Sequence, residues 1–480
     1  MGDFGVWLAF GMFVIFLALI LIGYNVAFSF ASTAIVFSFV GNLTGDFNPD
    51  RLNLLAERYF NSVRDETLLA VPFFVLMGAV LEKSGLAERL LNAIGMLMGP
   101  LKGGVAAAVV VVGTLLAAAT GVVAATVIVM GLLSLPTMVR LGYDHKLATG
   151  VIIASGTLAQ LLPPSIVLIL LASQLGTGIL GLFAGSLLPG LLLAFLYAAY
   201  ALIISQLRDV GPAMPPEERT LSGKVLALEI VFSVIPVIML IMAVLLSIFF
   251  GWATPTESGV VGVLGALVLG VLNYFFDKAL VAAGATHVTP TWRLRKNTIT
   301  SSVRSATNIT VLVMTLLLCS NFFSLVFDVL GGQKQAAEWL SGIGGGKNGF
   351  VLVAMIAIFI LGINLEFLEI TFIVVPIFLP AMAALEFSTV DRVWFSVLMA
   401  INLNMAFISP PVGFSLFYLQ SVAPPEVKTA DIHKGAIPFM VLQGLALVII
   451  GIFPQIVEAS FNFFINTPEA VEAISVVGGG

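Results

Sequence analysis

The stretches LLPPSIV (161–167) and ISPPVGF (408–414) each place two adjacent prolines inside a long apolar run. Each proline lacks a backbone N–H donor and its ring clashes with the preceding helical turn, so a continuous helix cannot pass through either pair. Hydrocarbon cannot satisfy the carbonyls left without partners, and such a break persists only against protein or a water-filled cavity. We therefore predict a broken membrane helix at Pro163 and Pro164 and another at Pro410 and Pro411.

The two breaks belong to a longer internal correspondence. The proline pairs are 247 positions apart, and other features recur in the same order at a similar offset. These features are TLLAVPFF (67–74) with TLLLCSNFF (315–323), Gly95 with Gly344, LPTM (135–138) with LPAM (379–382), and Asp144 with Asp391. Interrupted segments at corresponding positions of two halves are typical of secondary transporters that bind their substrate near the membrane midplane. The sequence thus predicts an all-α polytopic membrane protein with two structural repeats, which we hypothesise to be inverted.

The composition indicates a membrane environment. Hydrophobic residues make up 59% of the 480 and charged residues only 10%, whereas soluble domains carry about 25% charged residues. At roughly 20 apolar residues per span, the chain has room for roughly 10 to 14 membrane segments. Residues 6–41 are expected to form two retained spans broken near Gly23. A net charge of −5 without a basic cluster excludes nucleic acid as a partner, and the single Cys319 excludes a multi-cysteine metal site.

The remaining segments differ in length and polarity. The apolar run 68–81 is too short for a span, which predicts a re-entrant or buried segment. Stretches 51–66 and 87–98 carry apolar residues three and four positions apart among charges, so both are expected to be amphipathic helices. Polar stretches 205–224 and 277–304 are candidate extramembrane connections, and the excess of Lys and Arg in the second predicts that it is cytoplasmic.

We divide the chain into five parts on this basis, and the scaffold and hairpin assignments within them are those that the family resemblance below implies. They are 1–66 for N-terminal scaffold spans and an amphipathic connection, 67–204 for the first repeat with a hairpin and a broken helix, 205–306 for the inter-repeat connection and scaffold spans, 307–424 for the second repeat with a hairpin and a broken helix, and 425–480 for a C-terminal span and tail.

Five longer motifs carry a resemblance to a known family. They are PFFVLMGAVLEKSGLAERL (72–90), GYDHKLATGVIIASGTLAQLLPPSIV (142–167), LFAGSLLPGLLL (182–193), ATPTES (253–258) and NLNMAFISPPVGFSLF (402–417). Over about residues 11–456 the chain resembles the large, DctM-like membrane subunit of the tripartite ATP-independent periplasmic (TRAP) transporters. The segment GINLEFLE (362–369) resembles a longer subgroup that includes mannitol or chloroaromatic-acid systems. By contrast, ATGVVAAT (119–126) departs from the Ser- and Asp-bearing stretch that is common in the family.

The resemblance implies an architecture, a function and a set of partners. The implied fold has two re-entrant hairpins and two broken helices in a transport domain that moves like an elevator against a scaffold. The implied function is secondary-active, Na+-coupled uptake of a small organic acid, with no cofactor besides the coupling ion. A periplasmic substrate-binding protein and a small four-span membrane subunit would be separate chains. The expected location is the lipid bilayer of the bacterial inner membrane.

The polar residues around the two breaks are the main candidates for binding Na+ and substrate. In the first segment they are Ser155, Gly156, Thr157, Pro163, Pro164 and Ser165, and in the second Asn402, Asn404, Ser409, Pro410, Pro411, Gly413 and Ser415. Hydroxyls, amides and unwound carbonyls supply the oxygen ligands that hard cations prefer. The positive ends of the half-helices after each proline pair are candidate anion binders. The alternative is a proline-kinked helix whose Ser and Thr side chains merely bond their own backbone.

Asn364, Glu366 and Glu369 are a third candidate group. A charged side chain at the centre of a membrane helix costs roughly 2.5 to 3.5 kcal/mol, which argues for a cavity, a partner or a protonated state. Ion or substrate binding is one explanation of the two carboxylates, and a turn at the membrane edge after Gly362 is the other. Thr254 and Glu257, with Pro255 between them, instead predict a capping box at a helix start.

Two other classes of function compete with this reading. A self-sufficient Na+- or H+-coupled anion carrier of the ion transporter superfamily would share the broken hairpins without needing a binding protein. An intramembrane enzyme is disfavoured because the sequence contains neither HExxH nor GxSxG.

Overall fold

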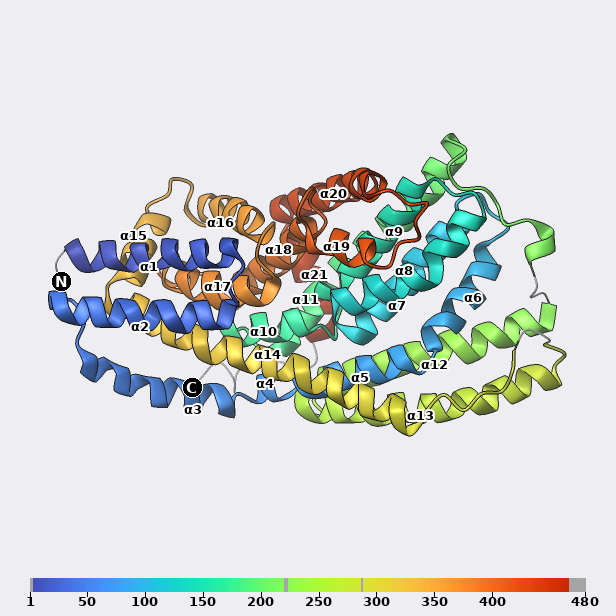
Figure 1. Cartoon of the computed structure of the whole chain (residues 1–480), viewed down its shortest axis with the longest axis horizontal. Helices are drawn as coiled ribbons and strands as arrows, with labels where there is room; N and C mark the ends of the chain where they lie inside the picture. Colours follow the sequence, from blue (N-terminus) through green and yellow to red (C-terminus); the bar gives the residue numbers. More distant parts are fainter. Residues whose placement is uncertain (1–2, 220–222, 286–287, 466–480) are drawn as a thin grey trace.

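The computed structural model describes residues 3–219, 223–285 and 288–465. Within these residues every regular element is a helix (Figure 1). The predicted C-terminal part, 425–480, is described only as far as residue 465. The part of the chain that the structure describes contains nine helices long and apolar enough to cross a membrane. These helices are α1 (Asp3–Ile22), α2 (Val26–Thr44), α8 (Val123–Arg140), α11 (Ile179–Leu207), α12 (Gly223–Phe249), α13 (Pro255–Ala282), α14 (Lys296–Val329), α17 (Phe367–Ala384) and α20 (Thr429–Ile452).

The N-terminal region begins with the expected pair of spans. Helices α1 and α2 are separated at Gly23, whose φ of 100° suits glycine because it has no Cβ. Asn25 then caps α2 by accepting hydrogen bonds from two backbone N–H groups. This confirms the predicted break near Gly23.

A bent helical segment follows the first two spans. It comprises η1 (Pro49–Asn53), α3 (Leu54–Arg64), α4 (Glu66–Leu69), α5 (Val71–Lys83) and α6 (Leu86–Met98). Both stretches expected to be amphipathic helices are helical, as α3 and α6. Helix α6 confirms its prediction by burying one face against α7 and α12, whereas no residue of α3 is buried. The run 68–81 is largely buried and packs against α13 and α14. It continues past a 61° bend into α6, as in a broken span or a re-entrant loop.

Two helical hairpins lie further along the chain. The first joins α7 (Gly104–Thr120) to α8 through Gly121, which adopts a φ of +62°. The second joins α16 (Gly346–Gly362) to α17 across residues 363–366. Helix α15 (Gly332–Ser341) precedes α16 and meets it at 119°.

A broken helix follows each hairpin. The first consists of α9 (His145–Thr157), η2 (Leu158–Gln160) and α10 (Ile166–Leu175), and the second of α18 (Thr389–Phe407) and α19 (Phe414–Gln420). Both predicted breaks are therefore confirmed, and both Pro-Pro peptide bonds are cis. Asp144 caps α9, and Asp391 completes a capping box that begins α18, so these two corresponding residues both lie at helix starts.

The hairpins and broken helices gather at the centre of the molecule (Figure 1). Helix α14 runs along their lower edge in the figure, where it contacts α2, α5 and α17. Helices α1 and α2 lie at one end of the long axis, and α5, α12 and α13 lie toward the other. After the broken helices, α11 and α20 pack against α9 and α18, and α21 (Gln455–Ile465) lies against α11.

The two polar connections are shorter than the sequence predicts. Helix α11 extends to Leu207, and η3 (Pro216–Glu218) interrupts the segment before α12. Helix α13 continues to Ala282 and α14 begins at Lys296, so the predicted connection 277–304 is wrong at both ends.

Asp277 accounts for the first of these errors. It is buried in α13, where its carboxylate lies 3.3 Å from the Arg89 guanidinium of α6. The same guanidinium makes two contacts with Glu229 of α12, at 3.0 and 3.5 Å, and donates to Asn273. A buried ion cluster therefore joins α6, α12 and α13.

Candidate functional site

The two broken helices contact each other through the segments around their breaks. Helices η2 and α10 pack on α18, and α19 packs on α9. The second half of each broken helix also packs on the hairpin of the other half of the chain, α10 on α17 and α19 on α8. Both hairpins and both broken helices thus surround one buried region.

Ser155, Gly156 and Thr157 form the last turn of α9, and all three are buried. The Ser155 and Thr157 hydroxyls donate to the carbonyls of Ile152 and Ala154, at 3.2 and 2.8 Å. The alternative of local backbone bonding therefore applies to these two hydroxyls. The Thr157 hydroxyl also accepts a hydrogen bond from Gln443 Nε2 at 3.3 Å.

Ser165 and Gln160, on the two sides of the first break, differ from Ser155 and Thr157 because their side chains form no hydrogen bond with the described residues. Ser165 is the N-cap of α10, but its buried hydroxyl has no partner among the described residues. Gln160, in η2, is fully buried with neither amide atom paired in the described part of the chain. The tip of the first hairpin closes on this region, since a Cβ at Gly121 would lie 3.2 Å from the Ile166 nitrogen and 3.3 Å from the Pro164 carbonyl oxygen.

Asn402 and Asn404 lie in the last turns of α18 before the second break, and both are fully buried. Asn402 donates through Nδ2 to the Met355 carbonyl at 2.6 Å, which leaves its Oδ1 unpaired within the described residues. Neither amide atom of Asn404 has a described partner. Ser409 and Gly413 lie in the irregular segment that follows, beside Pro410 and Pro411.

Buried side-chain atoms without a described partner are therefore concentrated around the breaks. They include both amide atoms of Gln160, Ser165 Oγ, Asn402 Oδ1, both amide atoms of Asn404, Ser415 Oγ, Thr371 Oγ1 and Gln443 Oε1. Each such atom costs about 1–3 kcal/mol unless water, an ion or a ligand satisfies it. Sequence reasoning missed Gln160, Thr371 and Gln443. For Gln160 a signal existed, because it is an amide three residues before Pro163 in an apolar run.

Glu366 and Glu369 lie at the tip of the second hairpin and cap α17. Glu366 is the N-cap, and its backbone N–H donates to Glu369 Oε2 at 3.0 Å. The Tyr418 hydroxyl of α19 donates to Glu366 Oε1 at 2.9 Å. Both carboxylates are half-buried and locally satisfied, whereas Asn364 is exposed at the same turn. The turn after Gly362, which was one of the two explanations for the carboxylates, is thus present. Asn364 is exposed and does not join the buried polar residues around the breaks.

Thr120 and Thr126 are the polar groups of the divergent stretch at the first hairpin. Their hydroxyls lie 2.9 Å apart and bond each other, and Thr126 also bonds the Val122 carbonyl. Both side chains are buried. They stabilise the hairpin tip that meets the first break.

The region around the breaks fits a monovalent cation better than a multivalent metal. Its free groups are neutral amides and hydroxyls, whose oxygens are hard ligands. The described residues contain no group of three or more His, Cys, Asp or Glu side chains that could hold a metal ion. Neutral ligands provide little charge compensation for a divalent ion buried in a membrane.

Comparisons with known proteins agree with this architecture. The family model described as tripartite ATP-independent periplasmic transporter, DctM component, matches residues 13–456. The C4-dicarboxylate TRAP transporter large permease protein DctM of Pseudomonas aeruginosa is 27% identical over 420 residues, which cover 87% of this chain and 91% of that protein. The sialic acid TRAP transporter large permease protein SiaM of Vibrio cholerae is 26% identical, covering 92% of this chain and 95% of its own length.

A solved structure supports the fold independently. The YdaH transporter of Alcanivorax borkumensis superposes with a TM-score of 0.56 at 12% identity, covering 85% of this chain and 90% of that chain. The match to the family model spans nearly the whole chain, and the family consists of transport permease subunits rather than enzymes. The chain therefore belongs to the DctM component family of TRAP transporters and is a multi-pass protein of the inner membrane.

Proposed function

We propose that the chain is the large membrane subunit for Na+-coupled uptake of a small organic acid. The observation that carries this proposal is the set of partnerless buried oxygens around the two breaks. A cation bound there would satisfy the side-chain oxygens of Asn404 and Gln160, and it would offset part of the cost of burying these amides. Because these oxygens come from elements of both halves, binding would also tie the broken helices together.

The acid would be recognised mainly by backbone dipoles. Helix α10 has ten residues and begins at the first break, so its positive end can face a carboxylate. The Ser165 hydroxyl is available at the same end. The names of two relatives, one for C4-dicarboxylates and one for sialic acid, both denote carboxylic acids.

The partners follow from the family rather than from any surface of this chain. The printed family name is a tripartite periplasmic transporter. We therefore propose a periplasmic binding protein that delivers the acid and a small four-span subunit that completes the membrane unit. The hairpins and broken helices, which pack on one another and also on α11, α15 and α20, would move as one body against α1, α2, α12, α13 and α14.

Reconstitution tests the proposal directly. The chain, the small subunit and the binding protein are placed in proteoliposomes, and uptake of labelled dicarboxylates and sialic acid is followed with and without a Na+ gradient. We expect uptake only when all three proteins and inward Na+ are present. Uptake by the chain alone would instead support the self-sufficient carrier.

A substitution in the site adds a second readout. For Asn404→Ala, the loss of one ligand is expected to raise the Na+ concentration for half-maximal uptake about tenfold, equivalent to about 1.4 kcal/mol. Asn297→Ala, at an exposed position in α14, is the control and should leave this value unchanged. An unaltered Na+ dependence in Asn404→Ala would contradict the assignment of the ion to this region.

A further inference from the structure

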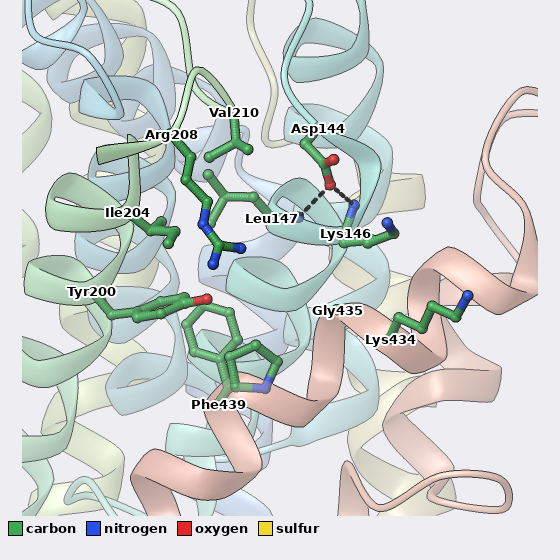
Figure 2. A pocket seen from close by; sticks show the side chains of 11 residues that line it. Asp144, Lys146, Leu147, Tyr200, Ile204, Arg208, Val210, Lys434, Gly435 and Phe439 are labelled. Carbon is green, nitrogen blue, oxygen red and sulfur yellow. Dashed lines mark hydrogen bonds between the residues drawn. The ribbon is translucent and has the colours of Figure 1, made fainter. Parts of the chain in front are cut away.

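A second polar pocket lies away from the breaks, where α9 begins, α11 ends and α20 begins. It encloses about 200 Å³, several times the roughly 30 Å³ that one water occupies in the liquid. Its walls include Leu147, Ile204 and Phe439, and its polar side chains are Asp144, Lys146, Tyr200, Arg208 and Lys434. Figure 2 shows Arg208 extending toward the Tyr200 hydroxyl, while Lys146 and Lys434 lie on the side of α9 and α20.

The charges around this pocket are unbalanced. None of Arg208, Lys146 and Lys434 forms an ion pair with a carboxylate in the described residues. The Asp144 carboxylate is engaged as the cap of α9, where it accepts from two backbone N–H groups at 2.7 and 3.4 Å (Figure 2). The Tyr200 phenol and the Arg208 guanidinium thus face each other, and the Lys146 and Lys434 side chains extend away from them at the rim, with one carboxylate that is already bonded (Figure 2).

Other carboxylates nearby are also engaged, and Asp431 in the first turn of α20 lies 3.9 Å from the His145 ring. Asp209 pairs with Lys102 at 3.0 Å, and Glu218 pairs with Arg140 at 3.2 Å. Both pairs lie on exposed positions and leave the pocket cations uncompensated. An anion with several acceptor oxygens is the complement of this arrangement, since Arg binds phosphate oxygens through a fork of N–H donors and Lys as a point charge.

The location indicates a source for such an anion. Helices α12 and α13 are consecutive and pack together, and the end of α13 lies beside the start of α12 (Figure 1). Residues 208–219, which include Arg208, are therefore on the same side as the basic residues 293–296. By the positive-inside rule that side is cytoplasmic, where basic pockets between membrane helices bind phosphate-bearing lipid headgroups.

We propose that this pocket binds a phosphate group, presented by an anionic phospholipid headgroup or as free phosphate. Arg208 and Tyr200 contact its oxygens, and Lys434 and Lys146 neutralise its charge at the rim. The site is separate from the breaks and independent of the transported substrate. Its occupancy would hold residues 208–219 against α9 and α20, since Arg208 is the residue at the end of α11.

Native mass spectrometry of the full-length chain in detergent tests this proposal. Phosphatidylglycerol, diacylglycerol with the same acyl chains, and inorganic phosphate are each titrated against wild type, Arg208→Gln/Lys434→Gln and the control Lys102→Gln/Arg140→Gln. At about 1 kcal/mol per cation, roughly fivefold each, the pocket variant is expected to weaken the tightest phosphatidylglycerol binding about 25-fold. The control should remain within about twofold, because its cations lie outside the pocket.

The possible outcomes distinguish free phosphate from a lipid headgroup as the ligand, and both from a failure of the proposal. Displacement of the lipid by equimolar inorganic phosphate, lost in the pocket variant, supports the proposal with free phosphate as the ligand. Resistance to phosphate, with lipid binding lost in the same variant, supports it with the headgroup as the ligand. Equal binding of diacylglycerol, equal losses in both double variants, or no loss in the pocket variant would overturn it.

Discussion

Replacing Arg89 by Gln probes the buried ion cluster that joins α6 to α12 and α13. The side chains of Arg89, Glu229 and Asp277 are 6%, 3% and 2% exposed, so water screens none of their charges. Without the guanidinium, both carboxyl groups must stay charged without a cation or take up protons, and either outcome costs free energy. Removing one partner of a buried ion pair costs about 3–5 kcal/mol. We expect Arg89→Gln to lower the free energy of unfolding by this amount.

A matched substitution on the same surface provides the control. Arg293 contacts Glu88 of α6 at 3.1 Å, but these side chains are 30% and 54% exposed. Exposed pairs of this kind contribute about 0–1 kcal/mol. Arg293→Gln should therefore lower the free energy of unfolding by at most about 1 kcal/mol, although, like Arg89→Gln, it removes an arginine that pairs with a carboxylate.

The assay is unfolding of the full-length chain in mixed micelles by a rising fraction of denaturing detergent, followed by circular dichroism. The triple variant Arg89→Gln/Glu229→Gln/Asp277→Asn removes the buried charges together, and it should recover most of the lost stability. It also remains informative if Arg89→Gln alone fails to fold. Equal losses in Arg89→Gln and Arg293→Gln would refute the reasoning, as would a triple variant no more stable than the single one.

Three further predictions follow from particular contacts. Asn404→Ala should leave stability unchanged or raise it by up to about 1–3 kcal/mol, because it removes two unpaired buried atoms; a clear loss in the same unfolding assay would indicate that Asn404 already has partners. Tyr418→Phe should cost about 1.5–3 kcal/mol by removing the donor to Glu366, with exposed Tyr24→Phe as the neutral control, and similar stabilities of the two variants would count against that bond. Gly121→Ala should lower the free energy of unfolding by about 1–2 kcal/mol because its φ is +62°. Gly344→Ala, with open space around it, should leave the free energy of unfolding unchanged. If both variants are as stable as wild type, Gly121 is not required for the turn of the first hairpin.

The breaks and helix starts were predictable because they depend on local chemistry. Adjacent prolines cannot donate to a helix in any tertiary setting, so Pro163–Pro164 and Pro410–Pro411 ended α9 and α18 as expected. The capping box at Thr254 likewise needs only residues within one turn, and it is present at the start of α13.

The first hairpin could not be located from the residues in the same way. Its turn consists of Gly121 and its neighbours inside the apolar run 103–135, which has the composition of one long helix. A positive φ at one glycine reverses the chain there, and nothing in the periodicity distinguishes this glycine from those at helix-packing positions. The hairpin was expected only from the family resemblance.

The ion cluster was unpredictable for a different reason. Arg89 lies 140 positions from Glu229 and 184 from Asn273, and each residue taken alone fits a polar helix end. Only the packing of α6 against α12 brings the charges together. Asp277 was consequently assigned to a solvent-exposed connection, although its carboxylate is almost completely buried.

The breaks themselves explain why unpaired polar groups collect beside them. Serines within continuous helices, such as Ser205 and Ser233, donate to the carbonyl four residues earlier, at 2.7 and 2.6 Å. Ser165 and Ser415 have the same chemistry, but the residues four positions earlier are Leu161 and Pro411, which lie in the irregular segments. The interruption that removes helical donors thus also removes the acceptors on which a buried serine normally relies. Each break thus leaves buried hydroxyls without a described partner where the two broken helices pack together, and the proposed ion site relies on this consequence of the proline pairs.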